Sequence, residues 1–139
     1  MIAQFINPSL DEIRALLQRV KTIAVVGLSG SPGRPSHGVA SALQSFGYRI
    51  VPVNPTIDQV LGERAYPDLP SVPEAIDLVD VFRSSEHVAG IVDDCIALHL
   101  PALWLQDGVI DEAAALRAKA AGIQVVMDRC IYRDYRRLF

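Results

Sequence analysis

Residues that can bind an anion follow the first apolar run of the sequence. That run, Ile23–Val26, leads into a loop of mostly small residues, Gly27-Leu28-Ser29-Gly30-Ser31-Pro32-Gly33-Arg34-Pro35-Ser36. Small residues allow backbone N–H groups to approach a phosphate, and a helix that begins at Pro35 would direct its positive end at the same place. Side-chain donors are supplied by Ser29, Ser31, Ser36 and Arg34. A ligand with several phosphates is the natural interpretation, and an ordinary turn without a ligand is the alternative.

The spacing of the glycines argues against a dehydrogenase. The dinucleotide pattern is G-x-G-x-x-G, whereas the glycines here stand at 27, 30 and 33, and Ser29 takes the place of the second glycine. An NAD site also needs an acidic residue after the second strand to hold the ribose hydroxyls, and this chain has Asn54-Pro55 there. An asparagine can still accept a hydrogen bond from a ribose hydroxyl.

Three further apolar runs end in polar residues. The segments are Phe82-Arg83-Ser84-Ser85, Gln106-Asp107-Gly108-Val109 and Asp128-Arg129-Cys130. Arg83 is placed to reach an anion, or it is a structural arginine on a loop. Gln106 has the groups to hydrogen-bond an amide or a base edge, and Cys130 permits thiol chemistry. Asp128 has a structural alternative, in which it pairs with Arg129 or Arg83.

The histidines do not form a recognisable site. His37, His87 and His99 lack the usual metal-ligand spacing with cysteine or carboxylate residues. His37 lies beside the glycine loop, although a residue on a helix surface is the favoured interpretation. The order of the residues alone does not assemble a Ser-His-Asp triad or a Cys-His pair. We therefore predict no metal site and no catalytic constellation.

Alternating strands and helices must position these residues. The predicted strands are the apolar runs 23–26, 50–53, 78–82, 102–105 and 123–127, and the predicted helices span about 9–20, 35–46, 85–99 and 111–121. Ser9 and Glu12 form a capping-box pattern, which Ser71 and Glu74 repeat before a short helical turn. This alternation predicts an α/β fold, a Rossmann-like doubly wound parallel sheet of about five strands with helices on both faces. The expected strand order is 3-2-1-4-5, with a ligand at the carboxyl ends near the switch point between strands one and four.

Length and composition predict one domain, residues 1–139. Half of the residues are apolar, and 13 basic against 16 acidic residues give a net charge of −3, which argues against a nucleic-acid surface. Two distant cysteines indicate reduced thiols, and Met1–Leu10 lacks the features of a signal peptide. No apolar stretch approaches the roughly 18 to 20 residues of a membrane span, so we expect a soluble, cytoplasmic protein. In the arginine-rich tail, 129–139, a helix that packs on the domain or on a partner subunit is favoured over RNA contact.

Six segments in order resemble the small CoA-binding proteins of bacteria and archaea. They are Val26-Gly27-Leu28-Ser29, Arg34-Pro35-Ser36, Pro52-Val53-Asn54-Pro55, Val79-Asp80-Val81-Phe82-Arg83, Leu103-Trp104-Leu105-Gln106-Asp107-Gly108-Val109 and Val126-Met127-Asp128-Arg129-Cys130. Those proteins are similar to the CoA-binding domain of succinyl-CoA synthetase alpha subunits and of ADP-forming acyl-CoA synthetases. The resemblance covers roughly residues 10 to 131 and implies a Rossmann-type domain that binds coenzyme A.

The resemblance also implies roles for individual residues. The phosphates would be held by Gly27, Ser29, Pro32, Arg34 and Ser36, and the adenosine region would be lined by Asn54 and Pro55. The middle of the ligand would be flanked by Phe82, Arg83 and Gln106, and the far wall would be closed by Asp128, Arg129 and Cys130. Three cleft arginines and a helix N-terminus would match the roughly four negative charges of CoA. Thr56 stands where the larger synthetases often carry a lysine, which leaves Arg34 or Arg83 as candidates for the 3′-phosphate.

The interpretation that follows is a non-catalytic module that binds or senses CoA or an acyl-CoA. In the synthetases, catalysis needs a phosphorylated histidine on a second domain and an ATP-grasp partner, for which a chain of this length has no room. Two alternatives stay open. One is a small thiol-dependent redox or transferase enzyme that uses Cys130. The other is an NAD(H)-responsive regulator, for which Asn54 is the discriminating residue. A homodimer and an unidentified protein partner also stay open.

Overall fold

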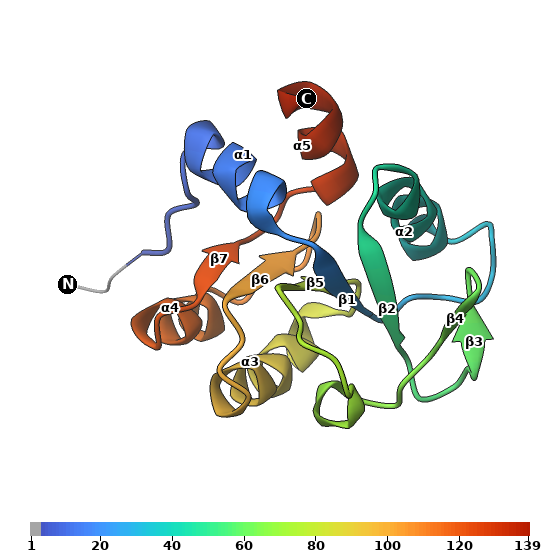
Figure 1. Ribbon diagram of the computed structural model, residues 1–139. Helices are drawn as coiled ribbons and strands as arrows, with labels where there is room; N and C mark the ends of the chain where they lie inside the picture. Colours follow the sequence, from blue (N-terminus) through green and yellow to red (C-terminus); the bar gives the residue numbers. More distant parts are fainter. Residues whose placement is uncertain (1–3) are drawn as a thin grey trace.

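Five short parallel strands form one sheet at the centre of the protein (Figure 1). In the computed structural model, which describes residues 4–139, they are β1 (Thr22–Val26), β2 (Arg49–Val53), β5 (Leu78–Val81), β6 (Ala102–Leu105) and β7 (Gln124–Val126). Nearly all of their residues are buried, as expected of strands that are covered on both faces. Residues 1–3, which belong to the stretch considered above for a signal peptide, lie outside the described residues.

Helices cover both faces of the sheet (Figure 1). One layer contains α1 (Leu10–Arg19), α2 (Pro35–Ser45) and α5 (Ile131–Leu138), and the other contains α3 (Val88–Ala97) and α4 (Glu112–Ala120). Alternate strand residues point to opposite faces, so Val25 belongs to the core under the first layer and Val26 to the core under the second. A short hairpin, β3 (Gln59–Val60) and β4 (Glu63–Arg64), follows β2. The predicted α/β fold, a Rossmann-like parallel sheet with helices on both faces, is confirmed.

The order of the strands differs from the prediction of 3-2-1-4-5. The sheet has the order β2-β1-β5-β6-β7, so the third main strand pairs with the first. The Pro52 carbonyl accepts a hydrogen bond from Tyr66 N–H (3.0 Å), whereas the Val53 carbonyl accepts one from Gly27 N–H (2.9 Å), so the backbone of Pro52 faces away from β1. Because a proline nitrogen has no hydrogen to donate to another strand, β2 is an edge strand. The switch point therefore lies between β1 and β5.

One of the two predicted capping boxes is present in the structure. In α1, Glu12 N–H donates to Ser9 Oγ (3.2 Å), and Ser9 N–H donates to Glu12 Oε1 (3.1 Å), which confirms the first capping box. The second box, at Ser71 and Glu74, was wrong. Ser71 ends a short 3-10 turn that begins at Leu69, and Glu74 pairs with Arg49. A proline at residue 73 disfavours a helical conformation for the residue before it.

The predicted helix at 85–99 is shorter than expected. A 3-10 turn, Ser85–His87, comes first, and α3 then spans Val88–Ala97. The Ser85 hydroxyl accepts a hydrogen bond from Ile110 N–H (2.9 Å), which ties this turn to the loop after β6. Among the helices within residues 4–139, none is long and apolar enough to cross a membrane.

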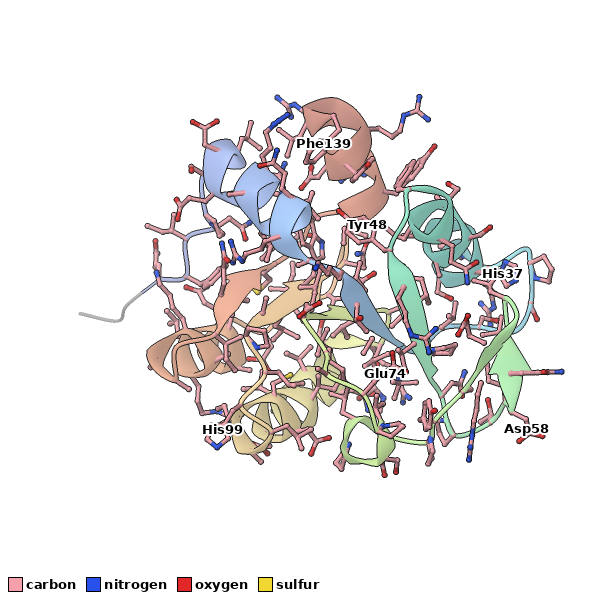
Figure 2. All side chains as sticks on the ribbon, in the orientation of Figure 1. His37, Tyr48, Asp58, Glu74, His99 and Phe139 are labelled. Carbon is pink, nitrogen blue, oxygen red and sulfur yellow. The ribbon has the colours of Figure 1, made fainter. Side chains whose placement is uncertain are left out.

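The arginine-rich tail forms α5, which packs back on the domain as predicted. The rings of Phe46 and Tyr135 stack with centroids 4.0 Å apart, and Ile131 is fully buried. At the other end of α5, the Arg14 guanidinium lies 4.6 Å from the centroid of the Phe139 ring (Phe139 is labelled in Figure 2). These contacts hold α5 against α1 and the end of α2.

Residue 27 has to be glycine because the chain turns there in close contact with the backbone of the loop after β5. Gly27 has a φ of +87°, in the region that side chains avoid. A Cβ added at this position would lie 2.5 Å from the Phe82 carbonyl oxygen and 2.9 Å from Arg83 Cδ. The absence of a side chain therefore lets the loops after β1 and β5 meet at the switch point.

We expect Gly27→Ala to lower the free energy of unfolding by about 3 kcal/mol, because it adds a backbone clash to the cost of a positive φ. Gly122→Ala is the matched control, since Gly122 has a φ of +89° and nothing within 4 Å of an added Cβ. Its expected loss is about 1 kcal/mol. Urea unfolding of both variants measures the difference, and equal losses would contradict the close-contact argument.

Candidate ligand-binding site

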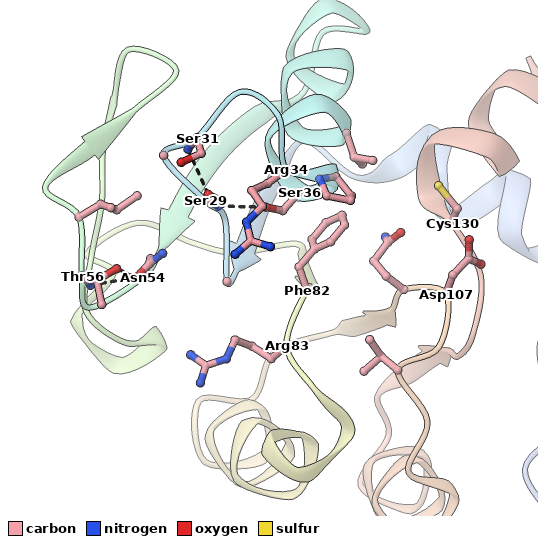
Figure 3. Close-up of a pocket in the computed structure, with 17 residues that line it drawn as sticks. Ser29, Ser31, Arg34, Ser36, Asn54, Thr56, Phe82, Arg83, Asp107 and Cys130 are labelled. Carbon is pink, nitrogen blue, oxygen red and sulfur yellow. Dashed lines mark hydrogen bonds between the residues drawn. The ribbon is translucent and has the colours of Figure 1, made fainter.

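A cleft of about 910 Å³ opens at the carboxyl edge of the sheet (Figure 3). Its volume lies within the range of roughly 300 to 1,000 Å³ that is usual for ligand sites. The walls come from the loops after β1, β2, β5 and β6 and from the residue before α5. They comprise Gly27, Ser29, Gly30, Ser31, Arg34, Pro35, Ser36, Val39, Asn54, Thr56, Ile57, Phe82, Arg83, Gln106, Asp107, Val109 and Cys130. The cleft therefore lies at the predicted edge of the sheet.

Serine side chains fold the glycine loop onto itself at one wall. Ser29 N–H donates to the Ser36 hydroxyl (3.0 Å), and Ser31 N–H donates to the Ser29 hydroxyl (3.0 Å). Pro35 is the first residue of α2, so Arg34 stands at the point where the positive end of that helix faces the cleft. The serine hydroxyls thus stabilise the loop through hydrogen bonds, and they are also potential donors to a ligand.

Asn54 joins this loop to the turn after β2. Its Nδ2 donates to the Leu28 carbonyl (3.0 Å), and its Oδ1 accepts from both Thr56 N–H (2.9 Å) and Thr56 Oγ1 (2.7 Å). The turn closed in this way brings Thr56 and Ile57 to the cleft, while Pro55 is exposed and lies outside its lining. The side-chain amide of Asn54 is therefore largely occupied by the protein itself.

Two guanidinium groups face the cleft without a carboxylate partner. Within residues 4–139, neither Arg34 nor Arg83 lies within 4 Å of an acidic side chain. The only side-chain hydrogen bond recorded for Arg83 in this part of the chain joins its Nη2 to His87 Nε2 (3.0 Å). On a chain with a net charge of −3, two such cations beside a helix N-terminus produce a locally positive cleft. This arrangement is suited to a ligand with several negative charges.

Cys130 and Asp107 lie on the opposite wall of the cleft (Figure 3), and Gln106 also lines the cleft. The Gln106 side chain is buried, and its Nε2 donates to Asp80 Oδ1 (2.5 Å) while its Oε1 accepts from Ile131 N–H (3.4 Å). Cys130 is the residue before α5, and its thiol is free. The Arg133 guanidinium holds the pKa of the Asp107 carboxyl below its usual value.

Asp80 lies fully buried behind this wall, in the middle of β5. Its Oδ2 atom is buried and has no hydrogen-bond partner, and Oδ1 has only Gln106. Burial therefore raises the pKa of Asp80 from 3.8 to about 7, although the hydrogen bond from Gln106 opposes the change. The sequence reasoning placed Asp80 only within a strand motif and missed its link to the cleft.

Nine of the thirteen predicted site residues line the cleft, and four do not. The four are Pro32, Pro55, Asp128 and Arg129. Arg129 instead donates from Nε and Nη2 to the buried carboxylate of Asp134 (2.6 and 2.8 Å), so the cleft has two arginines rather than three. Asp128 accepts from Gly108 N–H (2.8 Å), so its role is structural, although with a different partner from the Arg129 or Arg83 of the structural alternative.

Several lining residues were not predicted as site residues. They are Gly30, Pro35, Val39, Thr56, Ile57, Asp107 and Val109. Most of them directly adjoin a predicted residue in a loop after a strand, and this position was the available signal. Val39 and Ile57 are apolar and come from α2 and from the segment before β3, so nothing in their chemistry marks them as lining residues.

The histidines are dispersed in the structure. His37 and His99 lie on opposite sides of the molecule (Figure 2), and His87 is exposed beside Arg83. Within the described chain, no three His, Cys, Asp or Glu side chains gather as a metal site would require. Cys95 is buried in α3, and desolvation raises the pKa of its thiol to about 12.

Comparisons with known proteins identify relatives of the whole domain. The CoA binding domain family matches residues 21–136. The chain is 47% identical over 125 residues to the uncharacterized protein YneT of Bacillus subtilis, and the match spans 90% of this chain and 93% of YneT. It is also 29% identical over 77 residues to an ADP-forming acetate–CoA ligase of Archaeoglobus fulgidus. That match spans 54% of this chain but only 11% of the ligase.

Solved structures agree with these sequence matches. A hypothetical protein from Pyrococcus horikoshii OT3 superposes with a TM-score of 0.91 at 31% identity, and the match covers 99% of each chain. A protein from Thermus thermophilus superposes with a TM-score of 0.91 at 38% identity, and the match covers 95% of this chain and 100% of that one. A dinucleotide-forming acetyl-coenzyme A synthetase from Ca. Korarchaeum cryptofilum matches 76% of this chain with 25% of its own, at a TM-score of 0.67 and 26% identity.

The raised pKa of Asp80 predicts a pH-dependent stability. Between about pH 4 and pH 7 the folded protein keeps a proton that the unfolded chain loses, so the free energy of unfolding falls as the pH rises through this window. Each unit by which the folded-state pKa is raised changes the free energy of unfolding by about 1.4 kcal/mol across this window. Asp80→Asn stays neutral, so its stability relative to the wild type is expected to increase from pH 4.5 to pH 7.5. Urea unfolding across this range measures it, with Asp93→Asn on the surface of α3 as the control; parallel curves for wild type and Asp80→Asn would contradict the prediction.

Proposed function

The chain belongs to the CoA-binding domain family, and from this premise we propose that it binds coenzyme A or an acyl-CoA in the cleft as a non-catalytic binding or sensor module. The observation that carries the proposal is the polarity of the cleft. Arg34, Arg83 and the N-terminus of α2 make one part positive, whereas the opposite wall has the polar side chains of Gln106 and Cys130 and an Asp107 carboxylate that is paired with Arg133. CoA has the same division, because its phosphates are all on the nucleotide half.

The positive part of the cleft suits the nucleotide half. CoA carries about four negative charges near pH 7, and two guanidinium groups with a helix N-terminus and loop N–H groups offset much of that charge. Thr56 and Ile57 stand next to this part and offer a hydroxyl and an apolar surface to the adenosine. Arg34 and Arg83 are both candidates for the 3′-phosphate.

The wall that carries Gln106 and Cys130, where the Asp107 charge is offset by Arg133, suits the pantetheine arm. The arm is long, carries amides and ends in a thiol, and Gln106 has both a donor and an acceptor for an amide. In this orientation the thiol or thioester of the ligand comes toward Cys130. The cleft volume of about 910 Å³ is sufficient for a ligand of this size to be partly enclosed.

A binding role is favoured over catalysis by what surrounds the cleft. In the described residues, no serine, threonine or cysteine side chain is hydrogen-bonded to a histidine, as an activated nucleophile usually is. The similarity to the acetate–CoA ligase spans 11% of that enzyme, so its reaction does not transfer with the match. These observations support a protein that binds CoA as a sensor or as a binding module for a partner protein.

Cys130 supports a second candidate function, a thiol-dependent redox or transferase enzyme. The observation in its favour is that Cys130 lines the cleft on the wall toward which the arm would extend. An NAD(H) site is less well supported, because the Asn54 side chain already forms hydrogen bonds with Leu28 and Thr56. In addition, no acidic residue directly follows β2. NADH is therefore a comparison ligand in the titration below.

We expect CoA to bind with a dissociation constant below the millimolar range in isothermal titration, and NADH to bind more weakly. Arg34→Ala should weaken CoA binding by about 1.5 to 3 kcal/mol, because it removes a charge-assisted contact to a phosphate. Arg117→Ala, on α4 and paired with Asp93, is the matched control and should bind normally. The absence of binding by CoA and acetyl-CoA would overturn the proposed function, and unchanged affinity in Arg34→Ala would mean that the phosphates lie elsewhere.

Cys130→Ser should bind CoA with an affinity within about twofold of the wild type, because a hydroxyl replaces a thiol that makes only van der Waals contact with the arm. The same two proteins are incubated with acetyl-CoA, and free thiol is measured. The binding module predicts no turnover by either protein. Thiol release by the wild type that is lost in Cys130→Ser would instead establish the thiol-dependent enzyme.

A further inference from the structure

Among the buried side-chain nitrogen and oxygen atoms of the described chain, one lacks a hydrogen-bond partner, and it lies next to the candidate site. Asp80 Oδ2 has no hydrogen bond, although Asp80 is completely buried in the central strand of the sheet. Buried polar groups are nearly always paired, so an exception in a folded core calls for an explanation. Asp80 also lacks a cationic partner, which makes its ionised form costly.

The surroundings of Asp80 are apolar. In the register of the sheet it lies between Val25 of β1 and Trp104 of β6. Strand alternation places it on the same face as Leu78, under the layer of α1, α2 and α5. Burial and Gln106 are the two causes that shift the pKa of Asp80, and no charged neighbour is among them.

The charged groups on the surrounding elements have other partners. At the start of β5, the Asp77 carboxylate accepts from the N–H groups of Lys21 and Thr22, and after β5 Arg83 contacts His87.

The charged groups of the next strand and of the covering helices are likewise paired or exposed. After β6, Asp107 pairs with Arg133, and on α5 Asp134 pairs with Arg129. On α1, Arg14 donates to the Leu138 carbonyl, Glu12 belongs to the capping box, and Asp11 and Arg19 are exposed.

Gln106 connects Asp80 to the cleft. Its Nε2 donates to Asp80 Oδ1 (2.5 Å), its Oε1 accepts from Ile131 N–H (3.4 Å), and the same side chain lines the cleft. A carboxamide has two donors and two acceptor sites, so one donor and one acceptor remain for a ligand. Both contacts hold the amide in one orientation, because a flipped amide would place NH₂ against the Ile131 N–H.

We propose that Asp80 is a positioning residue, which orients the Gln106 carboxamide toward the arm of the ligand and takes up a proton when the arm covers that carboxamide. The inference rests on the proposed function. When the arm lies on Gln106, it displaces water from this wall and lowers the local polarity, which raises the cost of a charge on Asp80. A proton from solvent then neutralises Oδ2, the atom that has no partner. The raised pKa of about 7 in the free protein brings this step into the neutral range.

The test compares CoA with 3′,5′-ADP, which has the adenosine, the 3′-phosphate and one of the two 5′-phosphates of CoA but no pantetheine arm. Because phosphate monoesters also titrate in this range, the Asp80 contribution is the part of the pH dependence that is lost in Asp80→Asn. Isothermal titration is done from pH 6 to pH 8.5 in two buffers of different ionisation enthalpy, which counts the protons taken up. The wild type should take up more protons with CoA than with 3′,5′-ADP near pH 7. The ratio of the two affinities should fall by about threefold or more between pH 6.5 and pH 8, within the limit of tenfold per pH unit for one proton. A constant ratio in the wild type would overturn the proposal.

Variants separate positioning from a general structural effect. In Asp80→Asn, which stays neutral, the affinity ratio should no longer depend on pH, whereas Asp93→Asn should behave as the wild type does. Gln106→Met removes the amide between Asp80 and the ligand and should also abolish the dependence; it decides the matter if Asp80→Asn does not fold. A wild-type pH profile in either variant would contradict the inference. Failure of CoA to bind at any pH would overturn the proposed function and the inference with it, whereas CoA binding with a constant ratio would overturn the inference alone.

Discussion

The parallel hydrogen-bond ladder runs past the ends of the strands, and the cleft depends on this continuation. Gly27 N–H donates to the Val53 carbonyl (2.9 Å), Phe82 N–H to Val26 (2.8 Å) and Gln106 N–H to Val81 (3.4 Å). The first residue of each loop after β1, β5 and β6 is thus held by the last residue of a neighbouring strand. Because parallel strands place these ends at one edge, chemistry that is dispersed over eighty residues of sequence meets at a preformed position.

The distribution of ion pairs explains how a chain with net negative charge has a positive cleft. Four arginines away from the lining are paired with carboxylates, and these are Arg49, Arg117, Arg129 and Arg133. The pairs of Arg49, Arg117 and Arg133 are exposed and contribute little to stability, whereas Arg129 pairs with the buried carboxylate of Asp134. Their effect on the site is larger, since they neutralise the surrounding surface and leave Arg34 and Arg83 as the cations that face the cleft. The potential at the site therefore arises from which arginines are paired and not from an excess of basic residues.

Local patterns in the sequence were sufficient for the fold class and for most of the cleft. Apolar runs locate the strands, and the residues after them must lie at one edge, which places Ser29, Asn54 and Gln106 correctly. Contacts decided by tertiary geometry were not accessible in the same way. Arg129 turns away from the cleft because Asp134, five residues later, is buried beside it, and Asp128 adopts a φ of +60° to accept from Gly108. The strand order was missed although a signal was present, because Pro52 is compatible with an edge strand only.

Asp80 illustrates how the demands of the core and of the site conflict at one residue. An apolar residue between Val25 and Trp104 would avoid the cost of burying a carboxyl group, and the adjacent strand positions are apolar for that reason. Such a residue would leave Gln106 Nε2 without its acceptor, however, and only the long hydrogen bond from Ile131 N–H would then orient the carboxamide at the wall of the cleft. The free-energy cost of burying the Asp80 carboxyl group is thus linked to a fixed orientation of the Gln106 carboxamide at the cleft. Carboxyl groups whose pKa is displaced by burial beside a cleft are typical of functional positions, and the unpartnered oxygen of Asp80 is where this sheet departs most from the requirements of packing alone.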